Sequence, residues 1–580
     1  MRGDLGDFLR RYLLAFAMVA VLLLLTHAGA IAAWRLPDPD DALRLVELRD
    51  WLGGQGWYDV TQHRIDPMHG GVAMHWSRLV DLPLAGVVLA LRPMFGAAVA
   101  ESAAMLIVPM LTLAIILLLL ARVAWERLGA EASTLCALVL AMSVPVVMQV
   151  RPLRIDHHGW QIVAAVLAMN GLMTRHARAG GWLSGGAMAL GLAISVEGLP
   201  LTALFGALGA WRWLRGGETR LWLVHFAAAL AVVSVACFVA IRWGDVAQHC
   251  DAIAPVHLAV FACGAAGLWL MARMGWRGFA LIAGFALLGG AMLALYLGVA
   301  PQCRAGSFNM LDPLVRQMWY EGVPEGLPIW KQDWTTALQI AVPPLAGLLA
   351  CFGLMRVSQG EELVWWREYA LLLGGALVIA LALARAGAVA GAYAAVPLAW
   401  MVQQGLAGLR KGPLLQRLAR GLGLVLALMP SAPIALYGLL PAQKLSAAPV
   451  LARSVADCRV AQGAAILAQQ KRGVVLAPLD LGPDLLLATH HSVMATGHHR
   501  GAQAIHDNLL AFISPPDQAR QVMRAYGVTY VALCPALATA QNYAAGGLAQ
   551  SLISGRAPAW LEPLPSVSGE GLSVWRVKPE

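Results

Sequence analysis

The chain has 580 residues, of which 59% are apolar and only 13% are charged, whereas an ordinary soluble domain carries about 25% charged residues. This composition excludes a soluble globular protein. The net charge of +9 does not indicate a nucleic-acid partner, because the Lys and Arg residues are scattered singly and in pairs at the ends of apolar runs. Those runs approach the roughly 20 residues that span a bilayer core, so the sequence predicts a polytopic α-helical membrane protein.

With the N-terminus on the cytoplasmic side, the apolar runs predict about thirteen transmembrane helices. They lie near 9–33, 100–121, 131–149, 159–174, 180–195, 198–214, 221–241, 255–272, 278–299, 334–355, 368–384, 386–406 and 421–440. Every predicted inner loop then holds Arg, as the positive-inside rule requires. Making 80–96 a further span would move most of these Arg residues outside, so we interpret it as an interfacial or re-entrant segment. The first run resembles a signal peptide in its flanks but is long for one, and we interpret it as a retained helix.

An odd number of spans places the C-terminus outside. We therefore predict a membrane domain, 1–440, with external loops at 34–79, 150–158 and 300–333, followed by a soluble periplasmic domain, 441–580. Short β-like runs at 473–477, 492–495, 528–533 and 573–577, with a helical stretch at 516–526, indicate an α/β fold for this second domain. Cys250 and Cys303 lie in external loops, and Cys458 and Cys534 share the soluble domain. Disulfides and buried free thiols remain alternative interpretations of both pairs.

Acidic residues follow the first predicted helix directly. Asp40 and Asp41 stand just beyond the membrane boundary, where a carboxylate can bind a metal or accept a proton. The alternative is structural, because either residue before Ala42 is a suitable N-cap for a helix.

A second polar cluster is compressed between two spans, at Arg151, Arg154, Asp156, His157 and His158. Such a cluster at a membrane edge is costly without a function. The carboxylate and imidazoles suit Mg²⁺, Mn²⁺ or Zn²⁺, and the two arginines can hold an anionic head group. The alternative is an interfacial turn whose arginines contact lipid phosphates.

Two further charges, Glu197 in a short external turn and Arg385 at the outer end of a span, are candidates for the same cavity. Because Arg385 has no acidic residue near it in sequence, we expect a phosphate partner or simple snorkelling to the interface. The soluble domain adds Asp480, Asp484, His490, His491, His498, His499, Arg500, His506 and Asp507. Their spacing fits no standard structural zinc site, so we interpret them as pocket lining or a solvated loop.

In layout, the chain resembles the GT-C superfamily of membrane glycosyltransferases, and most closely the catalytic subunits of oligosaccharyltransferases. The shared features are an acidic motif in the first external loop, an Asp-containing motif in the second, a long external loop before the last spans, and a C-terminal external domain. Asp156-His157-His158 is similar to the Asp-His-His tract of archaeal members. The Trp-Trp-Asp acceptor motif of that family is absent, and Pro478-Leu479-Asp480 stands in its place.

This resemblance implies roles for individual residues. Asp40 or Asp41 would contact metal and acceptor, and Asp156 with His157 or His158 would form the second metal-binding motif. Arg385, followed by Tyr393 and Pro397, would hold the phosphate of the donor. Glu321 or Glu325 is a weaker match to a functional Glu of the long external loop.

The resulting hypothesis is a glycosyltransferase of the cytoplasmic (inner) membrane with its active site on the periplasmic side. It would move a sugar or oligosaccharide from a polyprenyl-phosphate-linked donor to an extracytoplasmic acceptor, with Mg²⁺ or Mn²⁺ as cofactor. The acceptor stays open among glycolipid, polysaccharide and protein, with a slight preference for the first two. The rival interpretations are a transporter or lipid flippase and a non-catalytic scaffold for envelope assembly.

Overall fold

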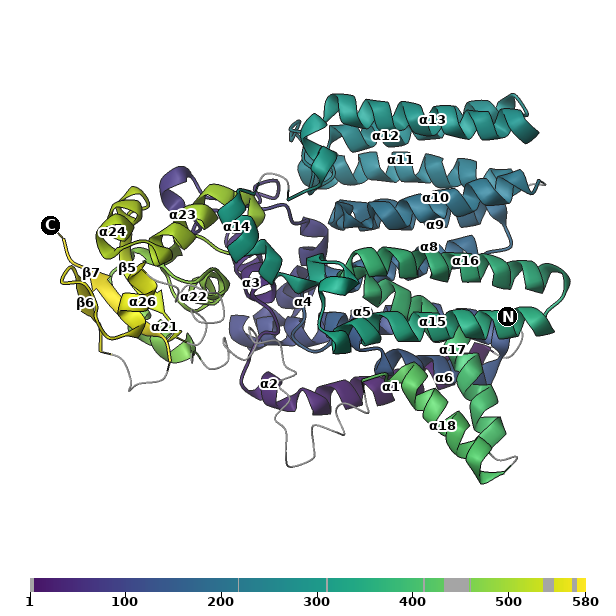
Figure 1. Ribbon diagram of the computed structural model, residues 1–580, viewed down its shortest axis with the longest axis horizontal. Coiled ribbons are helices and arrows are strands. Elements are labelled where there is room, and N and C mark those ends of the chain that lie inside the picture. The colour runs from purple at the N-terminus through teal and green to yellow at the C-terminus, as the bar shows by residue number, and fades with distance from the viewer. Residues whose placement is uncertain are drawn as a thin grey trace. The chain divides into compact units, whose positions relative to one another are not determined.

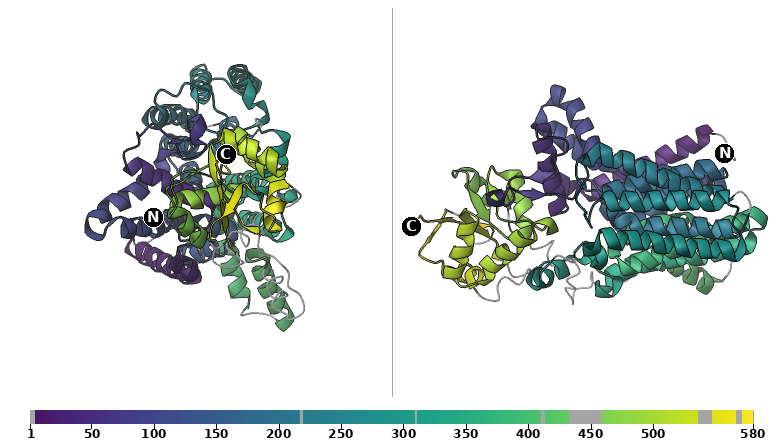
Figure 2. Two further views of the ribbon diagram at one scale, coloured as in Figure 1. Left: turned by 90° about the vertical axis from the view of Figure 1, so that its left-hand side faces the viewer. Right: turned by 90° about the horizontal axis from the view of Figure 1, so that it is seen from above.

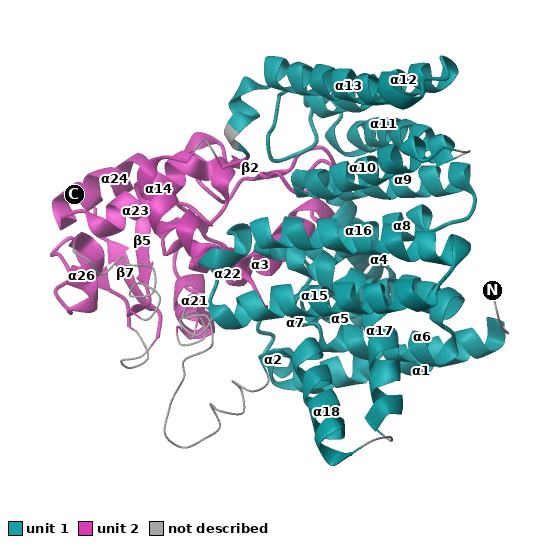
Figure 3. Cartoon of the chain, turned by 45° about the vertical axis from the view of Figure 1, so that its right-hand side comes forward, with its two compact units in different colours: residues 1–35, 77–306, 324–441 teal, residues 36–76, 307–323, 442–580 magenta. Residues whose placement is uncertain are grey.

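A computed structural model describes residues 5–216, 219–308, 311–409, 413–431, 458, 460–535, 547–565 and 571–579. The chain forms two compact units, each built from three separate segments (Figure 3). Unit 1 comprises 1–35, 77–306 and 324–441, and unit 2 comprises 36–76, 307–323 and 442–580. The sequence analysis divided the chain once, at residue 440, whereas each unit of the structure gathers segments that contact one another. Parts of two predicted external loops therefore belong to unit 2.

Unit 1 is helical, and its long helices run roughly parallel to one another (Figures 1 and 2). Its α-helices are α1 (Leu5–Thr26), α2 (Ala28–Ala32), α4 (Arg78–Phe95), α5 (Ala97–Leu128), α6 (Ala130–Met142), α7 (Val144–Val150), α8 (His158–Leu172), α9 (Ala177–Ile194), α10 (Leu199–Leu214), α11 (Arg220–Arg242), α12 (Pro255–Arg273), α13 (Gly278–Val299), α15 (Trp334–Val357), α16 (Gly360–Ala382), α17 (Gly387–Leu409) and α18 (Leu414–Leu428).

The predicted spans from 9–33 to 386–406 fall on these helices, with α1 and α2 sharing the first span and α6 and α7 sharing the third. The last predicted span, 421–440, overlaps the end of α18, and its part from 432 to 440 lies outside the described residues. Among the described residues, eight helical segments are long and apolar enough to cross a membrane, or nine if α6 and α7, bent by 80°, form one span. The helices α8, α9, α10 and α18 are not among the eight, and neither is α4, which covers the stretch predicted to be interfacial. An integral membrane protein is therefore confirmed, while the count of thirteen stays a prediction.

Glycines allow α9 to pack directly against the backbone of its neighbours. A Cβ atom on Gly181 would lie 2.3 Å from the carbonyl oxygen of Trp222 in α11, and one on Gly185 would lie 2.2 Å from that of Phe226. On the α8 side, a Cβ atom on Gly180 would lie 2.3 Å from the carbonyl oxygen of Gly171. Small residues permit such close helix contacts in membranes, where burial of apolar surface does not by itself drive association.

Unit 2 contains a five-stranded sheet in the order β4-β3-β5-β7-β6. Strands β4 (Ser492–Val493), β3 (Val474–Leu476) and β5 (Val528–Leu533) are parallel, and β7 (Ser573–Val577) and β6 (Leu561–Pro563) continue the sheet antiparallel. The helices are α3 (Pro39–Leu52), α14 (Pro313–Met318), α21 (Val460–Ala468), α22 (Gly482–Ala488), α23 (Ala502–Ile513), α24 (Pro516–Ala525) and α26 (Gly547–Ile553). The four predicted strands and the helix at 516–526 are confirmed, and the short edge strand β6 was not predicted.

The predicted first external loop folds onto the C-terminal segment within unit 2. It contains the hairpin β1 (Thr61–Gln62) and β2 (Val72–Ala73), and the backbone of Val493 bonds both Arg64 and Asp66, at 2.8 and 2.9 Å. Arg64 also donates to the carbonyl oxygens of Leu486 and Thr489. The segment 307–323 contributes Leu311 and Val315 to the apolar core beside α23. Unit 2 is thus completed by residues that precede α4 and α15.

Both cysteine pairs form disulfides. Cys250 and Cys303 join the loop after α11 to the end of α13, and Cys458 and Cys534 join the start of the C-terminal segment to the end of β5. The disulfide interpretation of the sequence is therefore confirmed for both pairs. All four residues lie in segments that were predicted to be external.

Candidate functional site

The tight turn between α7 and α8 carries the second polar cluster. Arg151 ends α7, and the N–H of Arg154 bonds the Arg151 carbonyl oxygen at 3.1 Å. Leu153 adopts a left-handed φ of 70°, a conformation that is strained for a branched residue and that persists where the surroundings fix it. The turn thereby buries a run of polar side chains, namely Arg154, Asp156, His157 and His158.

Asp156 is the centre of this cluster. Its Oδ1 atom lies 2.6 Å from Nδ1 of His157, and its Oδ2 atom lies 3.5 Å from Nε2 of His158. Arg154 Nη2 is 3.6 Å from the same Oδ2 atom. The other ring nitrogen of His158 bonds Oε1 of Gln161 at 2.9 Å, one turn along α8, which orients the ring. The sequence-predicted cluster is therefore assembled around one buried carboxylate.

A second charged group comes from three short 3₁₀ turns. Arg385, in the turn Ala384–Ala386, places Nη1 2.6 Å from Oε1 of Glu197 and Nη2 3.4 Å from Oε1 of Glu325. Glu325 also lies 3.7 Å from Nε2 of His158, which joins this group to the Asp156 cluster. The acidic partners of Arg385 are distant in sequence, and its pair with Glu197 joins two residues that were predicted to share a cavity. Glu321, the alternative to Glu325, lies in the turn Tyr320–Gly322 of unit 2.

Three of these residues, His158, Glu197 and Arg385, line a cavity between the helices of unit 1, and we call their side of it the mouth. The cavity volume is about 70 Å³, and about 740 Å³ when the open space in front of it is included. His158, Gln161, Glu197 and Arg385 supply its polar lining. Its walls are apolar and come from α8, α9, α10, α16 and α17, with Ile162, Leu192, Leu201, Ile379 and Val389 among them. Such a cavity suits a ligand with a charged head and a long apolar tail.

The charges at the mouth determine each other's protonation. Burial opposes ionisation of Asp156, but the charges of His157 and His158 outweigh burial and hold the pKa of Asp156 well below its usual range. Burial also opposes protonation of His158, yet the carboxylates of Asp156 and Glu325 raise its pKa to about 9. The pKa of Glu325 is likewise lowered, because Arg385 and His158 outweigh its burial. The mouth thus holds ionised carboxylates at neutral pH.

The donor atoms fit a divalent metal. One ligand atom from each of Asp156, His157 and His158 lies within 4.8 Å of the other two, and all three residues are buried. One carboxylate with two imidazoles is a set that favours Mn²⁺ or Zn²⁺ over Mg²⁺, which prefers oxygen ligands. Binding would displace the proton of His158, since a metal takes neutral imidazole.

The first-loop aspartates belong to unit 2, at the start of α3. The helix is capped by Asp38, whose side chain accepts from the N–H of Asp40, with Pro39 at the first helical position. The expectation that Asp40 or Asp41 is the N-cap was therefore wrong, because Pro39 fixes a helical φ one residue earlier. Asp41 is fully buried, whereas the Asp40 side chain is 34% exposed and lies 3.3 Å from Nε2 of His498.

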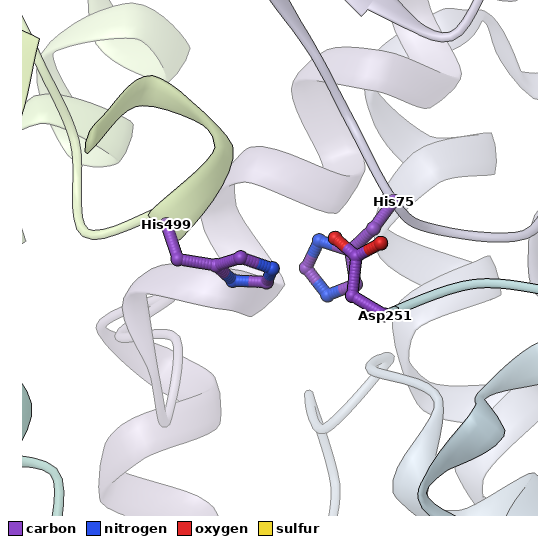
Figure 4. A group of neighbouring side chains, drawn as sticks. All are labelled: His75, Asp251 and His499. Carbon is purple, nitrogen blue, oxygen red and sulfur yellow. The ribbon is translucent and has the colours of Figure 1, made fainter. Parts of the chain in front are cut away.

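The weaker candidates of the C-terminal segment lie in different elements. His490 is exposed and bonds the backbone of Gln470, and Asp480 lies in the turn Leu479–Leu481. The His499 ring lies 4.7 Å from that of His75, and Figure 4 shows the two rings beside each other. Asp251, also labelled there, belongs to unit 1. Tyr393 is buried in α17 and donates to the carbonyl oxygen of Ala165.

No protein-family model matches the sequence, and comparison with curated proteins finds no match either. Solved structures do match. The structure is similar to the archaeal oligosaccharyltransferase AglB from Archaeoglobus fulgidus in complex with an inhibitory peptide and a dolichol-phosphate, with a TM-score of 0.62 and 13% identity over 92% of this chain and 71% of that one. The chain has the fold of a GT-C glycosyltransferase.

A second structure of the Archaeoglobus enzyme, in complex with Zn and sulfate, matches this chain with a TM-score of 0.58 and 15% identity. It covers 96% of this chain and 73% of that one. At this level of identity the likeness establishes the GT-C fold. The roles of individual residues rest on the geometry described above.

Proposed function

We propose that this chain is a membrane glycosyltransferase that takes a sugar from a polyprenyl-phosphate-linked donor and transfers it to an acceptor outside the cytoplasm. The observation that carries this proposal is the apolar cavity with His158, Glu197 and Arg385 at its mouth, joined through Glu325 to the buried Asp156 cluster. The apolar walls match the chemistry of a polyprenyl chain, and the charged mouth matches that of a phosphate. Solved relatives of the same fold carry dolichol-phosphate, or Zn and sulfate, which supports this choice of ligand.

Each part of the site has a task in the reaction. Arg385 and Arg154 bind the donor phosphate as negative charge develops on it. Asp156, His157 and His158 would hold a divalent metal, which supplies further stabilisation of that charge when bound. Asp40 is the partly exposed member of the first-loop pair, and it accepts the proton of the acceptor. Asp41 is buried, and we assign it to holding the start of α3 or to the metal.

We place the site on the periplasmic side of the inner membrane. The Arg-rich loops support this orientation, because they alternate with the loops that carry the site. The disulfides Cys250–Cys303 and Cys458–Cys534 support it independently, since disulfides persist in oxidising compartments.

The direct test is release of polyprenyl phosphate by the purified full-length protein in detergent. An envelope lipid extract supplies lipid-linked sugars and acceptors, and the assay is run with EDTA or with Mn²⁺, Zn²⁺ or Mg²⁺. We expect metal-dependent release by the wild type and loss in Asp156→Ala. The matched control is Asp245→Ala, which removes another Asp–His contact in unit 1, that of Asp245 with His249 at 3.0 Å. Absence of release under all conditions from folded wild-type protein would refute the proposal in favour of transport or scaffolding.

A further inference from the structure

Unit 2 has a cavity of its own, lined by α24 and by strands β5 and β7 (Figure 1). Its volume is about 360 Å³, and about 680 Å³ when the open space in front of it is included. The first residue of β5, Val528, and the last residue of β7, Val577, form its apolar lining together with Met523 of α24. Ligand pockets have volumes of about 300 to 1,000 Å³, so this cavity has the size for a small molecule.

Three cationic side chains complete the lining. Arg520 and Arg524 stand one turn apart on α24, and Lys578 directly follows β7. None of the described residues that line the cavity is acidic. The cavity therefore combines an apolar lining with a concentration of positive charge.

Two of the cations are held by contacts with neutral groups. The guanidinium carbon of Arg520 lies 5.6 Å from the centre of the Trp560 ring, and stacking of this kind uses the face of the guanidinium and not the N–H groups along its edge. Lys578 Nζ donates to the carbonyl oxygen of Ala559 at 2.9 Å. An ammonium group has three protons, so this bond uses only part of its capacity. These contacts position both side chains and leave their charges uncancelled.

The arginine next to the cavity in sequence is arranged differently. Arg576 Nη1 lies 3.6 Å from Oε2 of Glu562, the residue opposite it on β6, and its Nη2 donates to Oε1 of Gln470 at 2.6 Å. A carboxylate thus balances this charge within the sheet. On α24, by contrast, Arg520 and Arg524 repel each other, because like charges one helical turn apart are destabilising. An anion bound in the cavity would remove that repulsion.

We propose that this cavity is a binding site for a phosphate monoester, such as a phosphorylated sugar. A phosphate monoester carries a charge of about −1.5 to −2 at neutral pH and three acceptor oxygens. Three cations match this charge better than the single charge of a carboxylate. Arg520 and Arg524 supply forked donors for pairs of phosphate oxygens, and Lys578 supplies a point charge. The apolar lining contacts the carbon skeleton that carries the phosphate.

This inference goes beyond the proposed function and does not depend on it, because every lining residue belongs to unit 2. The test is isothermal titration calorimetry of glucose 6-phosphate with the full-length protein in an uncharged detergent. All proteins carry Arg385→Gln, which removes the arginine assigned to the donor phosphate. We expect saturable binding that weakens as salt screens the charges, and no binding of glucose.

Arg524→Gln is expected to raise Kd for glucose 6-phosphate roughly 10- to 100-fold, the usual effect of losing a charge-assisted hydrogen bond. Arg524→Lys keeps the charge and loses the fork, so it should raise Kd less. The matched control is Arg472→Gln, at an exposed arginine two residues before β3 and outside the cavity lining, which should leave Kd unchanged. If Arg524→Gln does not fold, Lys578→Gln decides, because that side chain is exposed at the end of a strand.

Two further probes distinguish the sources of the phosphate. Inorganic phosphate should bind to the same site more weakly than glucose 6-phosphate, because it lacks a carbon skeleton for the apolar lining. Binding of phosphatidic acid vesicles without binding of either soluble phosphate would overturn the inference and indicate a membrane-contact surface. Absence of glucose 6-phosphate binding, or a Kd that Arg520→Gln and Arg524→Gln together leave unchanged, would also overturn it. Each of these results leaves the polyprenyl phosphate release assay, and with it the proposed function, unaffected.

Discussion

Arg385 and Glu197 stand 188 positions apart in the chain, yet Nη1 of the arginine lies 2.6 Å from Oε1 of the glutamate. A donor phosphate that binds Arg385 has to compete with this carboxylate. The pair therefore sets the affinity of the cavity mouth for an anion.

Glu197→Gln is expected to tighten binding of polyprenyl phosphate, because it removes the competing negative charge. A gain of about 1.4 kcal/mol would appear as a tenfold lower Kd, measured by thermophoresis in detergent. Arg385→Gln is expected to weaken binding at least as much. Glu126→Gln, which breaks the exposed pair with Arg122, serves as the control and should leave Kd unchanged. Weaker binding by Glu197→Gln would show that the glutamate orients Arg385 instead of competing for it.

Metal should stabilise the folded protein through Asp156. Saturation at 100 times Kd adds about 2.7 kcal/mol to the free energy of unfolding, so Mn²⁺ should raise the apparent Tm of the wild type and EDTA should reverse the rise. Asp156→Ala should abolish this shift, and Asp245→Ala should keep it. If Mn²⁺ still raises the apparent Tm of Asp156→Ala, the metal binds at another site.

Asp484 predicts a pH dependence of stability in unit 2. Burial raises its pKa to about 6 from an ordinary value of 3.8. Because the folded state holds this proton more tightly than the unfolded state, stability falls as the pH rises from about 4 to about 6, and the full penalty is present above pH 6. The penalty at pH 8 is roughly 1 to 3 kcal/mol.

Asp484→Asn should therefore raise the apparent Tm at pH 8 and much less at pH 4. Asp517→Asn, at an exposed acid in the first turn of α24, is the control and should show no such pH difference. An equal Tm gain at both pH values would assign the effect to something other than ionisation.

The contact between α9 and α11 predicts that alanine substitutions at two neighbouring glycines differ sharply in their effect on stability. Gly185→Ala should destabilise the protein by roughly 1 to 3 kcal/mol through overpacking, because its Cβ atom would meet the Phe226 carbonyl oxygen at 2.2 Å. Gly186→Ala is the matched control, since its Cβ atom would find its nearest neighbour at 3.9 Å. Thermal unfolding in detergent measures both, and equal stability of the two variants would contradict the close packing.

Cysteine accessibility tests the orientation. After reduction of intact cells with an opened outer membrane, a membrane-impermeant maleimide should label Cys250 and Cys303, which are disulfide-bonded until then. A cysteine introduced as Gln359→Cys, in the exposed loop between α15 and α16 that is predicted to be inner, should stay unlabelled until the inner membrane is opened. The reverse labelling pattern would show that the topology is opposite to the predicted one.

Local patterns allowed part of this architecture to be predicted. The Asp156-His157-His158 run is contiguous, so its three ligand types were visible in the sequence, and the strands of unit 2 are marked by short β-branched runs. Glu197 and Arg385 were assigned to one cavity from their places at the predicted outer ends of spans. Their ion pair and the contact of Asp40 with His498 were not visible, because they join segments that no spacing rule relates. Pro39 is a local signal that places the N-cap at Asp38. The prediction of Asp40 or Asp41 relied instead on the position of an acid next to an apolar run.

The docking of the first external loop has a consequence for biosynthesis. Arg64 finds its carbonyl partner at Leu486 only after a further 422 residues have been made. At 5 to 20 residues per second, roughly 20 to 80 s pass before that partner exists. Residues 36–76 therefore remain without their C-terminal partners for nearly the whole of translation. In the proposed orientation, the protein should depend on periplasmic chaperones that protect this loop until the C-terminal segment is made.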